Sequence, residues 1–135
     1  GDIVDKEGNI LGKHNGIFNY TIGQRKGIKI SSKDPLYVVD IDVKRNQIVV
    51  GNEDEIYKNK LIATNINWIS IEELRKEMNV KAKIRYGGRE SKCKISKIEN
   101  DKVLVEFDQE QRAITSGQSV VFYKKDIVLG GGIIL

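Results

Sequence analysis

The segment Asn19–Gly27 (NYTIGQRKG) places a glutamine and two cations, Gln24, Arg25 and Lys26, between two glycines. Glycines in such positions favour a turn, and side chains on a turn are held away from the core. The two basic side chains are either ordinary solvated surface, or they are held out to contact an anionic partner. The segment alone leaves both interpretations open.

Two further segments could contribute to binding. In Lys81–Arg89 (KAKIRYGGR), Arg85 and Tyr86 end a strand-like run before a glycine turn. Arg forms bidentate hydrogen bonds with phosphate and Tyr stacks on bases or sugars, a combination typical of proteins that hold looped RNA. The alternative is a solvated strand face on which Tyr86 covers the core. Gln118 could offer its amide to a ligand, although its segment by itself indicates only a turn and a strand.

The sequence offers little for catalysis. It contains no Gly-x-x-x-x-Gly-Lys-Ser/Thr phosphate loop, no Gly-x-Gly-x-x-Gly after a strand, and no Ser/His/Asp order typical of hydrolases. The glycine run Gly130–Gly132 lies at the end of a strand that no helix follows, so close backbone packing at a barrel seam is favoured over phosphate binding. We therefore expect no catalytic residue in this chain.

His14 and Cys93 are the single members of their residue types. One histidine in a polar loop favours local hydrogen bonding over acid–base chemistry. Cys93 alternates with Ile95 on the inward face of a predicted strand while Lys92 and Lys94 face outward, which favours a core position over a nucleophile. One cysteine and one histidine exclude an internal disulfide and a Cys/His zinc site, and we expect no metal.

The composition fits one ordinary domain or two small ones that share an interface. Among 135 residues, 39% are hydrophobic and 31% are charged, and no apolar run approaches the roughly 18 residues of a membrane span. We expect a cytosolic, globular protein without a membrane segment. A net charge of +4 permits a nucleic-acid partner without requiring one. Because the chain begins with Gly1 and a strand-like run, we expect it to be part of a longer polypeptide.

The elements that position these residues are mainly β. Two hairpins are predicted in the first part of the chain, formed by residues 1–5 with 10–12 and by residues 36–42 with 47–51. Between them, Ile17, Tyr20 and Ile22 are spaced like one face of a short helix that ends at Gly23.

The charged tract Asn52–Lys60 separates this first part from the second, and we place a boundary near Lys60, with domains at 1–60 and 61–135. Ser70–Glu73 is a capping-box pattern, which predicts a two-turn helix over Ile71–Met78. Five β-rich runs follow, separated by Gly, Asn or Asp turns: 80–86, 92–98, 102–107, 118–123 and 127–135. Short strands at this spacing predict a small closed barrel.

Several sequence blocks occur in order from Gly1 almost to Leu135. They are GKHNGIFNYTIGQRKGI, PLYVVDID, IVVG, NWIS, KIRY, QRAITSGQSVVFY and VLGGGII. Together they resemble the C-terminal half of the tRNA-specific 2-thiouridylases, bacterial and organellar enzymes that thiolate the wobble uridine of certain tRNAs. Several ordered blocks are far more specific than any single motif.

The resemblance implies a mainly β fold: a small β-rich central domain with a short helix at 1–60, and a six-stranded type of β-barrel, similar to a translation-factor barrel, at 61–135. It implies a parent enzyme whose N-terminal ATP-pyrophosphatase domain carries a nucleotide loop and two catalytic cysteines. This chain has neither, and Cys93 matches a barrel position. In the parent, ATP and Mg²⁺ would serve to adenylate the uridine O2, and a cysteine persulfide would deliver sulfur to C2. The chain itself would need no cofactor.

The resemblance carries a tRNA-binding role over to Arg85, Tyr86 and Gln118. The loop Gln24–Lys26 becomes either an RNA-facing loop or an interdomain loop that packs against the N-terminal domain. Ser116 stands where the family usually has proline, which predicts a looser turn before Gln118.

The partners implied are tRNA, the N-terminal catalytic domain and, for the parent enzyme, a sulfur-donor protein. The chain would then be the tRNA-binding part of a tRNA-uridine 2-sulfurtransferase. A different interpretation stays open, namely a stand-alone β-barrel module that binds protein or a nucleotide and whose basic residues only keep it soluble. Salt dependence separates the two, because RNA binding through several phosphates weakens steeply as salt rises.

Overall fold

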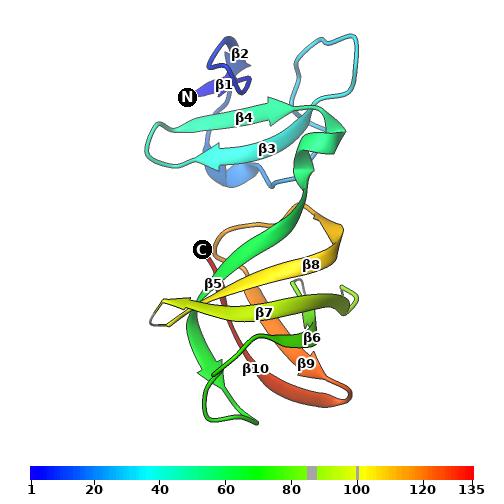
Figure 1. Cartoon of the computed structure of the whole chain (residues 1–135). Helices are drawn as coiled ribbons and strands as arrows, with labels where there is room; N and C mark the ends of the chain where they lie inside the picture. The colour runs from blue at the N-terminus through cyan, green and yellow to red at the C-terminus, as the bar shows by residue number, and fades with distance from the viewer. Residues whose placement is uncertain (85–87, 100) are drawn as a thin grey trace. The chain divides into compact units, whose positions relative to one another are not determined.

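The computed structural model describes residues 1–84, 88–99 and 101–135. Contacts within the chain divide it into two compact units, Gly1–Lys58 and Asn59–Leu135. Figure 1 shows that both units are built on strands, which long loops connect in the first unit. Among the described residues, no helix has both the length and the apolar character needed to cross a membrane.

The first unit contains a four-stranded sheet in the order β2-β1-β4-β3. Its strands are β1 (Asp2–Val4), β2 (Ile10–Lys13), β3 (Tyr37–Asp42) and β4 (Gln47–Gly51). The two antiparallel pairs, β1 with β2 and β3 with β4, confirm the two predicted hairpins. A parallel pairing of β1 with β4 joins the hairpins into one sheet.

The core of the first unit is aliphatic. Its buried members are Ile3, Ile17, Ile28, Val38, Ile48 and Val50. Tyr20 and Ile22 pack against this core together with Ile17, but the helix expected there is only one 3-10 turn, η1 (Ile17–Asn19). At Gly23 the φ angle of +92° turns the chain, and the Gly23 amide donates to the Val38 carbonyl at 2.8 Å. Pairing with β3 therefore replaces a longer helix.

The second unit is a closed barrel with the strand order β10-β5-β8-β7-β6-β9, which confirms the predicted six-stranded barrel. The strands are β5 (Tyr57–Trp68), β6 (Met78–Lys83), β7 (Ser91–Glu99), β8 (Lys102–Arg112), β9 (Ser119–Lys124) and β10 (Ile127–Ile134). Five of them coincide with the predicted β-rich runs. The sixth, β5, was not expected, because it begins within the charged tract, directly after the 3-10 turn η2 (Glu53–Ile56).

Buried and more exposed side chains alternate along β6, β7, β8 and β9, and the buried ones form much of the barrel core. On β8, Val103, Val105 and Phe107 are buried, and the residues between them are only partly covered. Cys93 and Ile95 of β7 are buried as predicted. Since successive side chains on a strand point to opposite faces, the lysines of β7 lie on the outer wall.

The helix predicted over Ile71–Met78 is wrong. Ser70 does not cap a helix; its hydroxyl donates to the Val128 carbonyl at 2.6 Å, and its amide donates to the Leu129 carbonyl at 3.2 Å. Leu74 is buried in the barrel core, and β6 begins at Met78. Because a two-turn helix is marginal without tertiary support, these contacts with β10 and the core outweigh the local capping signal.

The glycine run of β10 closes the barrel. A Cβ atom at Gly130, Gly131 or Gly132 would lie 2.4–2.6 Å from a backbone carbonyl oxygen of a neighbouring strand. Those carbonyls belong alternately to β5 and β9, the two strands that pair with β10. The predicted close backbone packing at a barrel seam is confirmed.

We expect Gly131→Ala to lower the free energy of unfolding of the barrel by roughly 1–3 kcal/mol, because the new methyl group collides with the Val120 carbonyl. Urea titration followed by the fluorescence of Trp68, the single tryptophan of the chain, measures this change. The matched control within the barrel is Ser119→Ala, at an exposed position of the neighbouring strand β9. Equal, small effects of both substitutions would contradict the proposed crowding.

Candidate nucleic-acid interface

The loop that contains Gln24 is organised by the Gln24 side chain itself. Its Oε1 accepts a hydrogen bond from the Thr21 amide at 3.0 Å, and its Nε2 donates to the Lys26 carbonyl at 2.8 Å. The Gln24 backbone is also paired with β3, since its carbonyl accepts from the Val38 amide at 2.9 Å. Gln24 therefore uses both ends of its amide within the loop and shapes it from inside.

The side chains of Arg25 and Lys26 are exposed in this loop. Neither forms an ion pair with a carboxylate in the described part of the chain. Phe18, on the preceding 3-10 turn, is 96% exposed, which is unusual for a large apolar side chain. Sequence reasoning missed Phe18, because an aromatic residue within an apolar pattern normally indicates core. This loop and the 3-10 turn before it thus expose Arg25, Lys26 and the ring of Phe18.

Gln118 lies in a tight turn before β9. The Thr115 carbonyl accepts from the Gln118 amide at 3.3 Å, and Gly117 has a φ angle of +87°. These are the features of a type II turn, in which glycine supplies the positive φ. The Gln118 side chain is exposed, and its carboxamide group, unlike the backbone amide, has no hydrogen-bond partner among the described residues.

Two hydrogen bonds anchor the turn at Ser116 and Gly117. Ser116 occupies the second turn position, where a type II turn favours proline but accepts other residues. The Ser116 hydroxyl donates to the Leu135 carbonyl at 3.2 Å, and the Gly117 amide donates to the Ile134 carbonyl at 2.7 Å. These bonds to the end of the chain hold the turn in place of the proline ring.

Arg85 and Tyr86 lie outside the described residues, so the structure does not test the role predicted for them. β6 (Met78–Lys83) precedes them in the chain. Lys83, the last residue of β6, is paired with Val121 of β9, near the Gln118 turn. The described end of β6 and the Gln118 turn therefore lie at the same end of the barrel.

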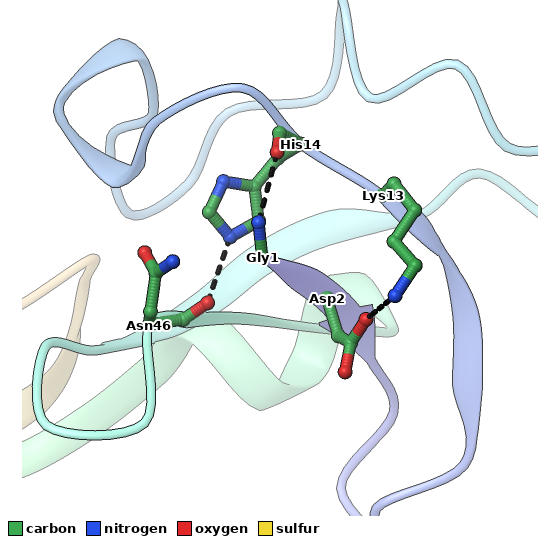
Figure 2. Close-up of polar contacts among 5 residues, drawn as sticks. All are labelled: Gly1, Asp2, Lys13, His14 and Asn46. Atoms are coloured by element: carbon green, nitrogen blue, oxygen red, sulfur yellow. Dashed lines mark hydrogen bonds and ion pairs between the residues drawn. The ribbon is translucent and has the colours of Figure 1, made fainter.

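His14 is a buried hydrogen-bonding residue, with 5% of its surface exposed. Its Nδ1 accepts from the Gly16 amide at 3.1 Å, so Nε2 carries the proton that is donated to the Asn46 carbonyl at 2.9 Å. Figure 2 shows the ring between Gly1 and the Asn46 turn. The geometry agrees with the local role expected from the sequence and leaves neither ring nitrogen available for acid–base chemistry.

An exposed ion pair flanks this histidine in Figure 2. The Lys13 ammonium donates to the Asp2 carboxylate, across the β1–β2 pair. The hydrogen bond from Lys13 lowers the pKa of the Asp2 carboxyl, and the nearby positive charges add to the effect.

Cys93 has the properties of a core thiol. It is 2% exposed, and burial raises its pKa to about 12, with a further contribution from the Asp108 carboxylate. A thiol in this state is protonated at neutral pH and is a poor nucleophile. Within the described ranges there is also no group of three or more His, Cys, Asp or Glu side chains that could hold a metal ion.

We expect Gln24→Leu to loosen the loop, because two backbone groups lose their partner. Hydrogen exchange of the Thr21 amide should accelerate roughly tenfold, the equivalent of about one hydrogen bond. Gln24→Glu should have a smaller effect on this amide, since a carboxylate still accepts from Thr21. Arg25→Gln is the matched control. Unchanged exchange in Gln24→Leu would show that the side chain does not hold the loop.

The raised pKa of Cys93 predicts a loss of stability at alkaline pH. The unfolded chain releases the thiol proton above its ordinary pKa of 9.0, while the folded protein keeps it until about 12. Because the unfolded state then binds fewer protons, the free energy of unfolding falls as pH rises from about 9 towards 12. Urea unfolding at about pH 8 and pH 10.5 should show a larger decrease for the wild type than for Cys93→Ala. Equal decreases in the free energy of unfolding of the two proteins would show that Cys93 does not cause the alkaline loss of stability.

Two protein-family models match the chain. The model described as "Aminomethyltransferase beta-barrel domain" covers residues 58–134, and "tRNA methyl transferase PRC-barrel domain" covers residues 1–52. The barrel of the second unit is thus matched almost completely by the first model.

Curated relatives match the chain over 134 residues, or 99% of its length. The tRNA-specific 2-thiouridylase MnmA 2 of Thermoanaerobacter sp. (strain X514) is 58% identical, MnmA 2 of Clostridium botulinum (strain Langeland) is 54% identical and MnmA of Clostridium perfringens (strain 13) is 55% identical. The chain spans 37–38% of the length of these relatives. The chain therefore belongs to the family of the aminomethyltransferase β-barrel domain, which a PRC-barrel domain precedes, and it is similar over 99% of its length to part of the tRNA-specific 2-thiouridylases.

Proposed function

We propose that this chain is the tRNA-holding part of a tRNA-uridine 2-sulfurtransferase, which thiolates the wobble uridine at C2 in an ATP-dependent reaction. The observation that carries the proposal is 58% identity over 134 residues with a protein named as a tRNA-specific 2-thiouridylase. Because the chain spans 37% of that relative, we assign the chemistry to the rest of the enzyme.

The residues of this chain do not form a recognisable binding site for ATP or Mg²⁺. The sequence lacks a phosphate loop, and the described residues provide no cluster of metal-binding side chains. The one thiol is buried and protonated, which does not suit a persulfide carrier. We therefore place nucleotide, metal and sulfur chemistry in the N-terminal catalytic domain, and we expect the sulfur-donor protein to contact that domain.

The part that remains for this chain is to bind and orient the tRNA. Arg25 and Lys26 are exposed cations that would contact phosphates or pack against the catalytic domain. Gln118 offers a free amide that both donates and accepts hydrogen bonds. Arg85 and Tyr86 keep their proposed roles of binding phosphate and packing on a base or sugar. A tRNA substrate would place the protein in the cytoplasm, as expected from the sequence.

Titration of the 135-residue chain with unmodified tRNA tests this proposal. A duplex RNA of the same length is the comparison ligand, at about 50 mM and 200 mM salt. We expect tighter binding of tRNA than of duplex, and affinity that falls steeply as salt rises. Arg85→Ala/Tyr86→Ala should weaken tRNA binding roughly tenfold or more, since one phosphate contact and one stacking contact are lost.

The matched control is Arg75→Ala, which removes an exposed arginine that is paired with Glu73 elsewhere on the barrel. Circular dichroism of each variant separates a loss of binding from a loss of fold. Salt-insensitive binding, or equal affinity for both RNAs in all variants, would contradict the proposal and favour the protein-interaction module instead.

A further inference from the structure

We propose that the outer wall of the barrel carries a binding groove for the phosphate backbone of tRNA. It is formed by Lys81 of β6, Lys92 of β7, Tyr123 and Lys124 of β9, and Lys125 in the turn that follows. These five residues are called the lysine groove below. The inference rests on the proposed function, because it names the surface that would bind the tRNA.

The strand register brings these side chains together. β6 lies between β7 and β9, and Lys81 is directly opposite Lys92 on one side and Tyr123 on the other. Directly opposed residues on antiparallel strands have Cβ atoms about 4.5–5.5 Å apart. The three residues therefore form a row across the outer face, and the surface at this row is hollowed into a groove of about 370 Å³.

The groove carries a net positive charge, because four lysines and one carboxylate line it. All four lysines are exposed, and none forms an ion pair with a described carboxylate. Asp108 also lines the groove, but it lies beyond ion-pair distance of the four ammonium groups. The adjacent outward lysine of β7 differs, since Lys94 is paired with Glu77 at 3.5 Å and with Glu106 at 3.9 Å.

The opposed pair Lys81 and Lys92 is unfavourable for the barrel alone. Like charges directly opposite each other destabilise a sheet, whereas a polyanion bound over them would remove the repulsion. The lysines are spread over three strands and a turn, which suits an extended backbone of phosphates better than one small anion. Half-buried Tyr123 adds a flat surface on which a ribose or base can pack.

The test compares two double variants that remove the same charge from the 135-residue chain. Lys81→Gln/Lys92→Gln alters the lysine groove, and Lys76→Gln/Lys97→Gln alters two exposed lysines that do not line it. We expect the groove variant to bind unmodified tRNA roughly tenfold more weakly at low salt, while the control stays close to wild type. The slope of log affinity against log salt should become shallower by roughly 0.7–0.9 for each lost phosphate contact.

A thermal melt of the groove variant excludes unfolding as the cause of weaker binding. Its Tm should equal or exceed that of the wild type, because a like-charge pair has been removed. If both double variants weakened tRNA binding equally, the proposed role of the groove would be overturned, since net charge alone would then explain the binding. Unchanged tRNA affinity in the groove variant would also overturn it, as expected if the groove serves an acidic protein. If the groove variant binds normally but Arg85→Ala/Tyr86→Ala still weakens tRNA binding, the groove is wrong and the proposed function stands. If the wild type does not bind tRNA even at low salt, both the groove and the proposed function are wrong.

Discussion

The close approach of β10 to its two neighbours is the constraint on which the barrel depends. Backbone carbonyls of β5 and β9 lie where side chains at Gly130, Gly131 and Gly132 would stand, so only glycine lets the three strands meet. This contact closes the sheet, and closure fixes the register of the remaining strands. The row of Lys81, Lys92 and Tyr123 exists because that register holds.

Polar side chains in this protein divide into those that build loops and those that remain free. Gln24 and His14 use both polar ends of their side chains on nearby backbone groups. Gln118, Arg25 and the lysines of the groove have exposed side chains whose polar ends find no partner within the described chain. The first group keeps the surface rigid, and the second group can meet a ligand without first breaking an internal bond.

Much of the fold could be predicted from the sequence, because five barrel strands follow an alternating or continuous apolar pattern between turn residues. β5 could not, since Lys58, Asn59 and Lys60 at its start are exposed and look like a linker. The helix predicted after Ser70 failed for the opposite reason. The local capping pattern is present, but Ser70 forms hydrogen bonds with β10 instead of capping a helix. At the candidate interface, Gln24 could be selected from the sequence as a possible ligand-binding residue. The sequence did not reveal that its side-chain amide already bonds to backbone groups of its own loop. The lysine groove depends on strand pairing, which a linear pattern does not reveal.

Lysine acetylation footprinting with and without unmodified tRNA tests the central claim, that this barrel holds tRNA, most directly. Mass spectrometry reports the modification of each lysine separately. The account predicts that bound tRNA protects Lys81, Lys92 and Lys124, while Lys76 and Lys97 react as before. If saturating tRNA left the reactivity of Lys81, Lys92 and Lys124 unchanged, or lowered that of all five lysines equally, the result would contradict the account.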